Sequence, residues 1–136
     1  MTDQSFFERI LDYATDGILV KDTQNRILRV NQAFEQMFGW TRAELIGSHF
    51  RDLPIIGQRW MDDFNTISDM IKSNGKVVNY LTKRLTRDGT DLPVSVSAFS
   101  VHDNNNEIVA YVSIYRNMLD HVRKEEQLQS LYDNSP

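Results

Sequence analysis

Residues 30–40 read Val30-Asn31-Gln32-Ala33-Phe34-Glu35-Gln36-Met37-Phe38-Gly39-Trp40, and they join the end of an expected strand to a short helix. Asn31 is a favourable N-cap, because its side-chain oxygen accepts a backbone N–H of the first turn. Phe34 and Phe38 follow four residues apart and share one side of that helix. Gly39 suits the left-handed conformation in which many helices end. The stretch therefore predicts a complete helix with an apolar face.

A short amphipathic helix is expected before this stretch, from a capping box at Ser5-Phe6-Phe7-Glu8 to about Tyr13. Gly17 then opens an apolar strand at 18–20, and a second strand at 26–30 completes a hairpin. The apolar side of the helix needs cover from the core or from a second chain. Its residues are therefore candidates for a dimer interface: Phe6, Phe7, Ile10 and Leu11.

Two further helices are expected after the opening stretch. Thr41-Arg42-Ala43-Glu44 is another capping box, and it starts a helix of one to two turns that ends at Gly47. Residues 48–58 lack a regular pattern. From about Trp60, apolar residues recur at helical spacing until Asn74-Gly75 ends the helix.

The rest of the core is predicted to be strand. Residues 77–87, 92–98 and 108–115 show alternation of period two, and turn-forming residues separate them at 88–89 and 103–106. The expected element order is thus α-β-β-α-α-α-β-β-β-α. One mixed antiparallel sheet with helices over one face is the α+β arrangement that this order favours.

The end of the chain is predicted to be an exposed helix. After Arg116 the pattern becomes helical with a thin apolar stripe, which is typical of a coiled-coil seam or a linker. We therefore divide the chain into an N-terminal amphipathic helix (1–15), a core (16–117) and a C-terminal signalling helix (118–136). This division remains an expectation from the pattern alone.

A short internal similarity suggests a repeat. Leu131-Tyr132-Asp133-Asn134-Ser135-Pro136 matches, in altered form, Ile10-Leu11-Asp12-Tyr13-Ala14-Thr15. A match of this length also arises by chance. If it is a true repeat, a second copy of the same module begins here, and the chain is one unit of a tandem array that passes a signal along.

Composition limits the classes of function. The 136 residues are 40% hydrophobic, enough for one compact domain with a helical tail. A formal net charge of −4 with both signs interspersed argues against a nucleic-acid partner. No apolar run approaches the roughly 20 residues of a membrane span, and no signal peptide is present, so we expect a cytoplasmic module without membrane contact. The absence of cysteine excludes disulfides, cysteine-ligated metals and thiol chemistry.

Four motifs, in order and at workable spacing, resemble the PAS sensor family over nearly the whole chain. They are Ala14-Thr15-Asp16-Gly17-Ile18, the stretch at 30–40, Glu44-Leu45-Ile46-Gly47, and Leu85-Thr86-Arg87-Asp88-Gly89-Thr90. The resemblance implies a five-stranded antiparallel sheet whose inner face and helices enclose a ligand pocket or a plain core. It also implies a homodimer that signals by helix reorientation. The output would lie on another domain of the same polypeptide: a histidine kinase, a diguanylate cyclase or a further PAS unit.

One motif departs from the family pattern. The family often closes its last strand with Asp-Ile-Thr, whose polar side chains couple the core to the exit helix, and this chain has Asn117-Met118-Leu119 there. Asn117 keeps the ability to hydrogen-bond but lacks the charge. Asn117 and Asp120 are therefore the signal-coupling candidates.

The resemblance also limits the cofactor, which stays unknown. Light-sensing flavin members form an adduct with a cysteine, and this chain has none, although a flavin held without an adduct stays possible as a less favoured reading. Haem-binding members carry an axial histidine early on the longest helix. That position falls here on Trp60, which cannot ligate iron, so haem is disfavoured. His49, His102 and His121 all lie outside this helix.

A set of residues is predicted to point inward from the sheet and the long helix, and these are the ligand-pocket candidates: Ile18, Val20, Phe38, Phe64, Ile67, Val78, Tyr80, Val96, Ala98 and Ser113. A solid hydrophobic core is the equally weighted alternative. Tyr80 and Ser113 favour a pocket, because polar tips among small apolar neighbours are typical of a small-molecule site.

Three functions from different classes follow. The first is a non-catalytic sensor that binds a small molecule in the core. The second is a ligand-free module that relays a signal by dimerisation, through its N-terminal apolar face and its exit helix. The third is an enzyme, which the chain disfavours because it has no nucleophile–base pair, phosphate loop or metal cluster.

Overall fold

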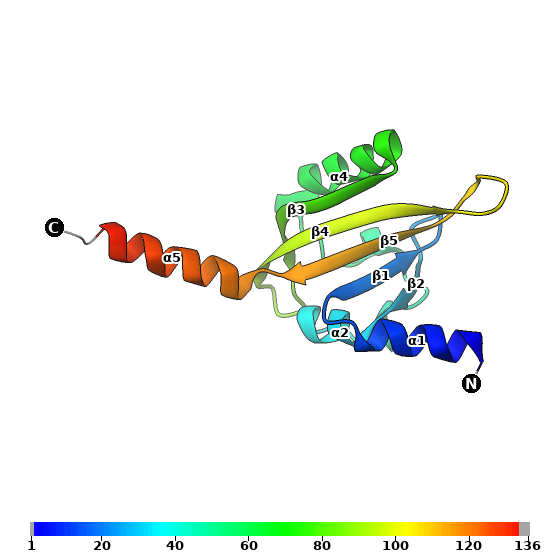
Figure 1. Ribbon diagram of the computed structural model, residues 1–136, viewed down its shortest axis with the longest axis horizontal. Helices are drawn as coiled ribbons and strands as arrows, with labels where there is room; N and C mark the ends of the chain where they lie inside the picture. Colours follow the sequence, from blue (N-terminus) through cyan, green and yellow to red (C-terminus); the bar gives the residue numbers. More distant parts are fainter. Residues whose placement is uncertain (1, 134–136) are drawn as a thin grey trace.

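The computed structural model describes residues 2–133 and contains a five-stranded antiparallel sheet with the strand order β2-β1-β5-β4-β3 (Figure 1). The predicted fold class and element order are confirmed, with two additional 3₁₀ helices, η1 and η2, between α3 and α4. The elements are α1 (Asp3–Tyr13), β1 (Gly17–Lys21), β2 (Ile27–Val30), α2 (Gln32–Phe38), α3 (Arg42–Leu45), η1 (Phe50–Asp52), η2 (Gln58–Trp60), α4 (Met61–Asn74), β3 (Lys76–Leu85), β4 (Asp91–His102), β5 (Ile108–Asn117) and α5 (Leu119–Asp133).

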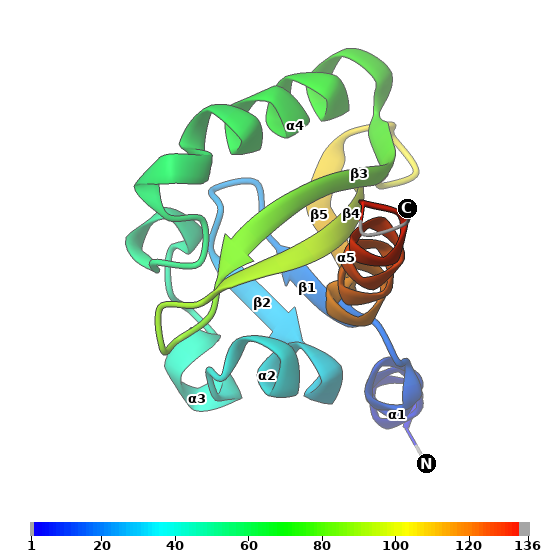
Figure 2. The same cartoon turned by 90° about the vertical axis from the view of Figure 1, so that its left-hand side faces the viewer.

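The helices cover different parts of the twisted sheet. In Figure 2, α4 lies above the sheet and α2 and α3 lie below it, while α1 and α5 lie to its right. α4 contacts β3 and β4, whereas α2 contacts β1 and α3 contacts β2. α5 projects away from the sheet (Figure 1). The sheet therefore has an α2 end and an α4 end, and each has its own helix partner.

The helix ends agree with the sequence signals at most positions. Asn31 is the N-cap of α2, Gly39 ends it with φ 84°, and Thr41 forms the predicted capping box with Glu44. The capping box predicted at Ser5 is wrong. The N-cap of α1 is Thr2, whose hydroxyl accepts the Ser5 N–H, so the helix begins earlier than its Ser-x-x-Glu pattern indicates.

The inner face of β1 carries Gly17, Leu19 and Lys21, which are all buried. Ile18 and Val20 alternate with them and lie on the opposite face, half-buried, so the prediction that they point inward is wrong. Gly17 fixes this choice of face, because a Cβ there would lie 3.2 Å from the Cα of Phe34. A larger residue here would require α2 to move away from β1 by a few tenths of an ångström.

A bulge in β3 changes which of its side chains face inward. Val77 pairs with Ala98 and Tyr80 with Val96, so two residues of β3 oppose the single residue Ser97. One of the two is Asn79, at φ 52°, and its N–H donates to the Ser97 hydroxyl at 3.0 Å. Val78 is 62% exposed, and the prediction that it points inward is wrong.

The C-terminal helix is exposed along most of its length, and its first residue, Leu119, packs half-buried against the core. No residue of α5 is fully buried. Met118, just before the helix, contacts β4 because its N–H donates to the Pro93 carbonyl at 2.9 Å. Asn134, Ser135 and Pro136 lie outside the described residues, and half of the proposed second repeat lies there. None of the helices within residues 2–133 combines the length and the apolar character that crossing a bilayer requires.

Candidate ligand-binding site

A pocket of about 240 Å³ lies between α4 and the inner face of the sheet. Its lining comes from α4, the four strands other than β2, the loop after β1, and η1: Lys21, Thr23, Asn25, Arg51, Phe64, Ile67, Ser68, Ile71, Lys72, Arg84, Val96, Ala98, Tyr111, Ser113 and Tyr115. Thr23, Arg51 and Lys72 are exposed, so they mark the mouth. The volume falls below the roughly 300–1,000 Å³ of pockets for drug-sized ligands, so a small ligand fits best.

The structure brings half of the predicted pocket residues together and separates the others. Five of the ten line the pocket: Phe64, Ile67, Val96, Ala98 and Ser113. Phe38 is fully buried at the α2 end, with its ring 5.4 Å from that of Tyr115 and outside the lining. Tyr80 is half-buried beside the core, where the nearby carboxylate of Asp63 raises its pKa. Ile18, Val20 and Val78 lie on the outer side, as described above.

The charged residues of the lining are all cations. Lys21, Arg51, Lys72 and Arg84 contribute to it, and no aspartate or glutamate within residues 2–133 does. This contrasts with the whole chain, in which 19 acidic residues outnumber 15 lysines and arginines. The pocket is therefore a local region of positive charge in a negatively charged protein.

Lys21 is only 8% exposed, although it carries an ammonium group. Its Nζ lies 4.6 Å from the ring centroid of Phe50 and 5.4 Å from that of Phe64, both within cation–π range. Within residues 2–133 this ammonium makes no hydrogen bond or ion pair. Burial, and then the nearby guanidinium of Arg51, lower the pKa of Lys21 to about 8.

Arg84 is 1% exposed and is the largest fully buried side chain of the described chain. Its Nη1 donates to the carbonyl of Lys83 at 2.8 Å and to the hydroxyl of Thr82 at 3.1 Å. The same nitrogen lies 3.5 Å from a carboxylate oxygen of Asp63. Its Nε has no hydrogen-bond partner among the described residues. The buried guanidinium is therefore only partly satisfied.

The two buried cations were missed in the sequence, although signals for them exist. Lys21 follows Gly17 by four residues, so the alternation of a strand places both on the same face. A glycine needed for close packing marks the inner face of its strand. Arg84 continues the alternation of Tyr80 and Thr82, which the pattern places on one side. Charge at these positions hides the signal, because an inward position is expected to be apolar.

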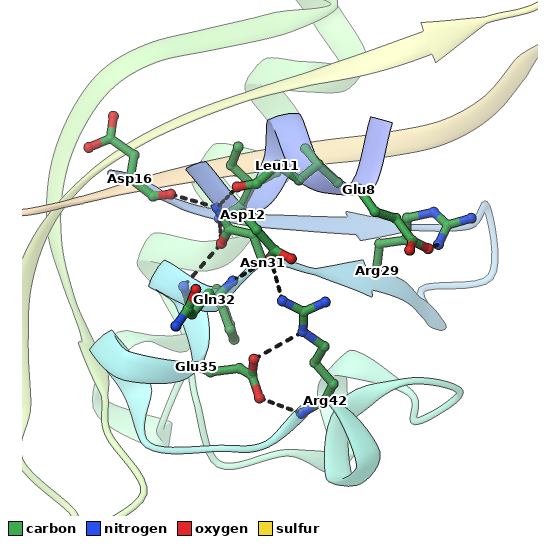
Figure 3. Close-up of polar contacts among 11 residues, drawn as sticks. Glu8, Leu11, Asp12, Asp16, Arg29, Asn31, Gln32, Glu35 and Arg42 are labelled. Carbon is green, nitrogen blue, oxygen red and sulfur yellow. Dashed lines mark hydrogen bonds and ion pairs between the residues drawn. The ribbon is translucent and has the colours of Figure 1, made fainter. Parts of the chain in front are cut away.

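The α2 end is built from a different kind of contact (Figure 3). The Asn31 carboxamide oxygen accepts the N–H groups of Ile18 at 2.8 Å and Phe34 at 3.0 Å. Its nitrogen donates to the carbonyls of Leu11 at 2.7 Å and Asp16 at 3.0 Å. One fully buried side chain thus joins α1, β1 and α2.

Charged residues around Asn31 hold α1 against the core (Figure 3). The Asp12 carboxylate accepts the backbone N–H of Gln32 at 3.1 Å and pairs with Arg42. Arg42 also contacts Glu35 at 3.0 Å. Leu11 is half-buried on the side of α1 that faces the core. The other three predicted interface residues present an exposed apolar surface, because Phe6, Phe7 and Ile10 are 58, 47 and 51% exposed.

The signal-coupling candidates lie where β5 meets α5. The Asn117 carboxamide oxygen accepts the N–H of Leu119 at 2.9 Å, so this side chain shapes the entry to the helix. Asp120 is exposed in the first turn, where a carboxylate complements the helix dipole.

The histidines do not line the pocket. His49 accepts the N–H of Arg51 through Nδ1 at 3.2 Å, and His121 lies 2.8 Å from Glu125 on α5. Among the residues that the structure describes, no group of three or more His, Asp or Glu could hold a metal ion. The arrangement at the pocket therefore supports binding chemistry through cations, hydroxyls and apolar side chains.

Solved structures share the fold. A crystal structure of the PAS domain of a protein from Colwellia psychrerythraea has a TM-score of 0.73 and 21% identity, covering 85% of this chain and 97% of that chain. An RNA-binding light-oxygen-voltage receptor has a TM-score of 0.77 and 19% identity, covering 96% of this chain but 37% of that chain. A PAS domain from a two-component sensor histidine kinase has a TM-score of 0.67 and 16% identity, covering 85% and 96%.

The sequence itself identifies the family. At the identities above, the solved structures establish a common fold alone. The family model described as "PAS domain" matches residues 15–120, which is most of the 136-residue chain and includes every strand of the sheet. The chain therefore belongs to the PAS domain family of sensory modules.

Proposed function

We propose that this chain is the sensing unit of a larger cytoplasmic signalling protein and that it binds a small molecule in the pocket beneath α4. The observation that carries the proposal is the state of the two buried cations. Within residues 2–133, Lys21 has no acidic partner and the guanidinium of Arg84 is only partly hydrogen-bonded, and both residues line the same hollow. Buried polar groups are normally satisfied, so their exceptions call for an explanation such as a bound ligand.

A route from this pocket to the exit helix is supported by the path of β5. The strand contributes Tyr111, Ser113 and Tyr115 to the lining and ends at Asn117, whose side chain shapes the start of α5. A ligand that moves β5 by a small amount would therefore change the direction in which α5 leaves the domain. Such a change is the signal that we propose passes to the output domain.

The output domain lies in the same polypeptide in this proposal. The family makes a histidine kinase, a diguanylate cyclase or a further PAS unit the candidates, and the domain itself would be non-catalytic. The exposed α5 supports the role of a connector, because its narrow apolar stripe needs a partner helix to be covered.

Mass spectrometry of freshly purified protein tests ligand binding. The native mass is compared with the denatured mass of the same sample. We expect an additional mass that is lost on denaturation and that identifies a small molecule. The protein is purified at low ionic strength, and a second sample is incubated with cell extract as a further source of ligand. If both samples show the mass of the chain alone, the proposal that this domain is a ligand-binding sensor is contradicted.

A ligand-free relay is the second candidate, and the exposed apolar face of α1 favours it. Phe6 and Ile10 are more than half exposed on a helix whose other side is held by Asn31 and Asp12. If dimerisation uses this face, the double substitution Phe6→Ser and Ile10→Ser converts dimers to monomers at micromolar concentration and leaves the fold intact. Sedimentation velocity measures this, and a variant that stays dimeric excludes the face as the interface.

A further inference from the structure

The pocket lining separates by polarity. Its apolar surface comes mainly from α4 and β4, as Phe64, Ile67, Ile71, Val96 and Ala98, whereas β1 and β3 each supply one buried cation, Lys21 and Arg84. We propose that the pocket takes a small organic monocarboxylate, with the carboxylate held by Lys21 and Arg84 and the apolar body against α4 and β4. This inference rests on the proposed function and adds the chemical class of the ligand.

Lys21 has no compensating anion within residues 2–133. An ammonium largely withdrawn from bulk water is unfavourable unless an anion or several acceptors compensate it. The rings of Phe50 and Phe64 compensate it only in part, and Arg51 adds repulsion. A methionine would fill this space without any charge. A carboxylate entering the pocket would provide the missing partner, and it would also relieve the repulsion between Lys21 and Arg51.

Arg84 keeps donors that the described part of the chain leaves unused. Its contacts with Thr82, Lys83 and Asp63 all use Nη1, so Nη2 has no acceptor among residues 2–133, and the Nε, which is closed to solvent, has none either. Because Asp63 already offsets part of the guanidinium charge, the two cations together leave roughly one positive charge to be matched. A singly charged carboxylate fits this balance better than a dianionic phosphate.

The size of the pocket and its mouth agree with such a ligand. A volume of about 240 Å³ suits a ligand smaller than the drug-sized molecules that fill pockets of roughly 300–1,000 Å³. The exposed cations Arg51 and Lys72 at the mouth provide a positive potential that attracts anions from solvent. Five apolar side chains require an apolar body, which excludes small inorganic anions as the best occupants.

Nuclear magnetic resonance titrations of the isolated domain test this inference with defined probes. The probes are sodium benzoate and sodium hexanoate at up to millimolar concentration, the neutral isosteres benzamide and hexanamide, and inorganic phosphate. The readouts are the methyl signals of Ile67 and Ala98, which line the pocket. We expect saturable shifts with the carboxylates, and binding of the amides and phosphate at least about tenfold weaker, since a charge-assisted hydrogen bond is the stronger one.

Substitutions locate the charge contacts. Lys21→Met should weaken carboxylate binding about ten- to hundredfold, as expected for losing a hydrogen bond to a charged group. Arg84→Met should have an effect of the same size, and Arg84→Lys serves if the first variant folds poorly. Lys76→Met, which alters an exposed cation of β3 outside the lining, should bind as the wild type does.

The outcomes separate the ligand class from the sensor function. Equal binding of amides and carboxylates, or carboxylate binding unchanged in Lys21→Met, would overturn the anionic class but leave a ligand pocket. Absence of any methyl shift with both carboxylates would also overturn the class. The mass measurement described above then decides separately whether the pocket holds a ligand of another kind.

Discussion

Asn31 at the α2 end and Lys21 at the α4 end are both polar side chains that the fold removes from water, but their surroundings are opposite. Asn31 satisfies both atoms of its carboxamide with four hydrogen bonds to three elements and one loop. Among the described residues, the Lys21 ammonium contacts two aromatic rings and lies near a cation, but it has no hydrogen-bond acceptor. A fully satisfied polar group specifies structure, whereas a buried charge without a partner reduces stability.

The aromatic residues of the two ends differ in the same way. Phe34, Phe38 and Tyr115 pack with ring centroids 4.7 to 5.6 Å apart at the α2 end. Phe64 stacks on Phe50 with centroids 5.7 Å apart, but it also lines the pocket, so part of its surface lacks packed neighbours. The comparison indicates that the α2 end holds the domain together while the α4 end is kept open for binding.

The largest expected effect tests this packing difference. Phe38→Ala should lower the free energy of unfolding by about 4 kcal/mol, because it leaves a cavity in a closely packed cluster. Phe64→Ala should lower it by only about 2 kcal/mol, since its ring already borders an open space. Urea denaturation followed by circular dichroism measures both. Equal losses would show that the two ends are packed alike.

The second prediction concerns the satisfied polar group. Asn31→Ala should cost about 3 kcal/mol, because it leaves buried backbone groups of α1, β1 and α2 without partners. Asn65→Ala, at an exposed position of α4, is the matched control and should change stability by less than about 0.5 kcal/mol. The same denaturation experiment applies. A cost near that of the control would show that water replaces Asn31 without loss.

The third prediction has the opposite sign, because it removes an unsatisfied charge. Folding lowers the pKa of Lys21 from 10.5 to about 8, so keeping it protonated opposes folding by up to roughly 3 kcal/mol below pH 8. Lys21→Met should therefore stabilise the unliganded domain at pH 7 by about 2 kcal/mol, after the loss of the cation–π contacts is included.

The dependence of this gain on pH follows from proton linkage. Between pH 8 and 10.5 the unfolded wild type binds more protons at Lys21 than the folded one, so wild-type stability rises with pH. The advantage of Lys21→Met should shrink across this interval. The difference between the two proteins isolates Lys21, because the neighbouring Arg51, Lys72, Arg84, Tyr111 and Tyr115 are common to both. An advantage that stays constant with pH would exclude a buried charge as its cause.

The smallest effect is expected from the ion pair that joins α1 to the sheet. Glu8 and Arg29 lie 2.7 Å apart, but both side chains are more than one-third exposed. Glu8→Gln should therefore cost no more than about 0.5 kcal/mol. Thermal unfolding measures this cost. A loss as large as that of Asn31→Ala would show that ion pairs contribute as much to the stability of the α2 end as the buried hydrogen bonds do.

The helices and strands were predictable because their signals are local. Capping residues such as Asn31 and Thr41 and the two periodicities mark them directly. Which side chains of β1 and β3 face inward was not predictable, because that depends on contacts between elements. The approach of Phe34 to Gly17 sets the inner face of β1, and the bulge at Asn79 exposes Val78.

The candidate site was predictable in its apolar half and at Ser113, but not at its cations. Phe64, Ile67, Val96 and Ala98 follow from periodicity, and they line the pocket. Lys21 and Arg84 were missed, because hydrophobic patterning assigns charged residues to solvent unless a partner is known. Their burial depends on how α4 sits over β1 and β3, and no local pattern reports that arrangement.

The burial of Lys21 also has an evolutionary consequence. A lineage that no longer uses the pocket gains stability by replacing this lysine with an apolar residue, and selection for binding no longer opposes the change. Once Lys21 is lost, Arg84 and Asp63, which form an ion pair, should be replaced together. Replacing only one of them would leave the charge of the other uncompensated. Descendants of this module should therefore divide into those that retain all three residues and those that have replaced them as a group.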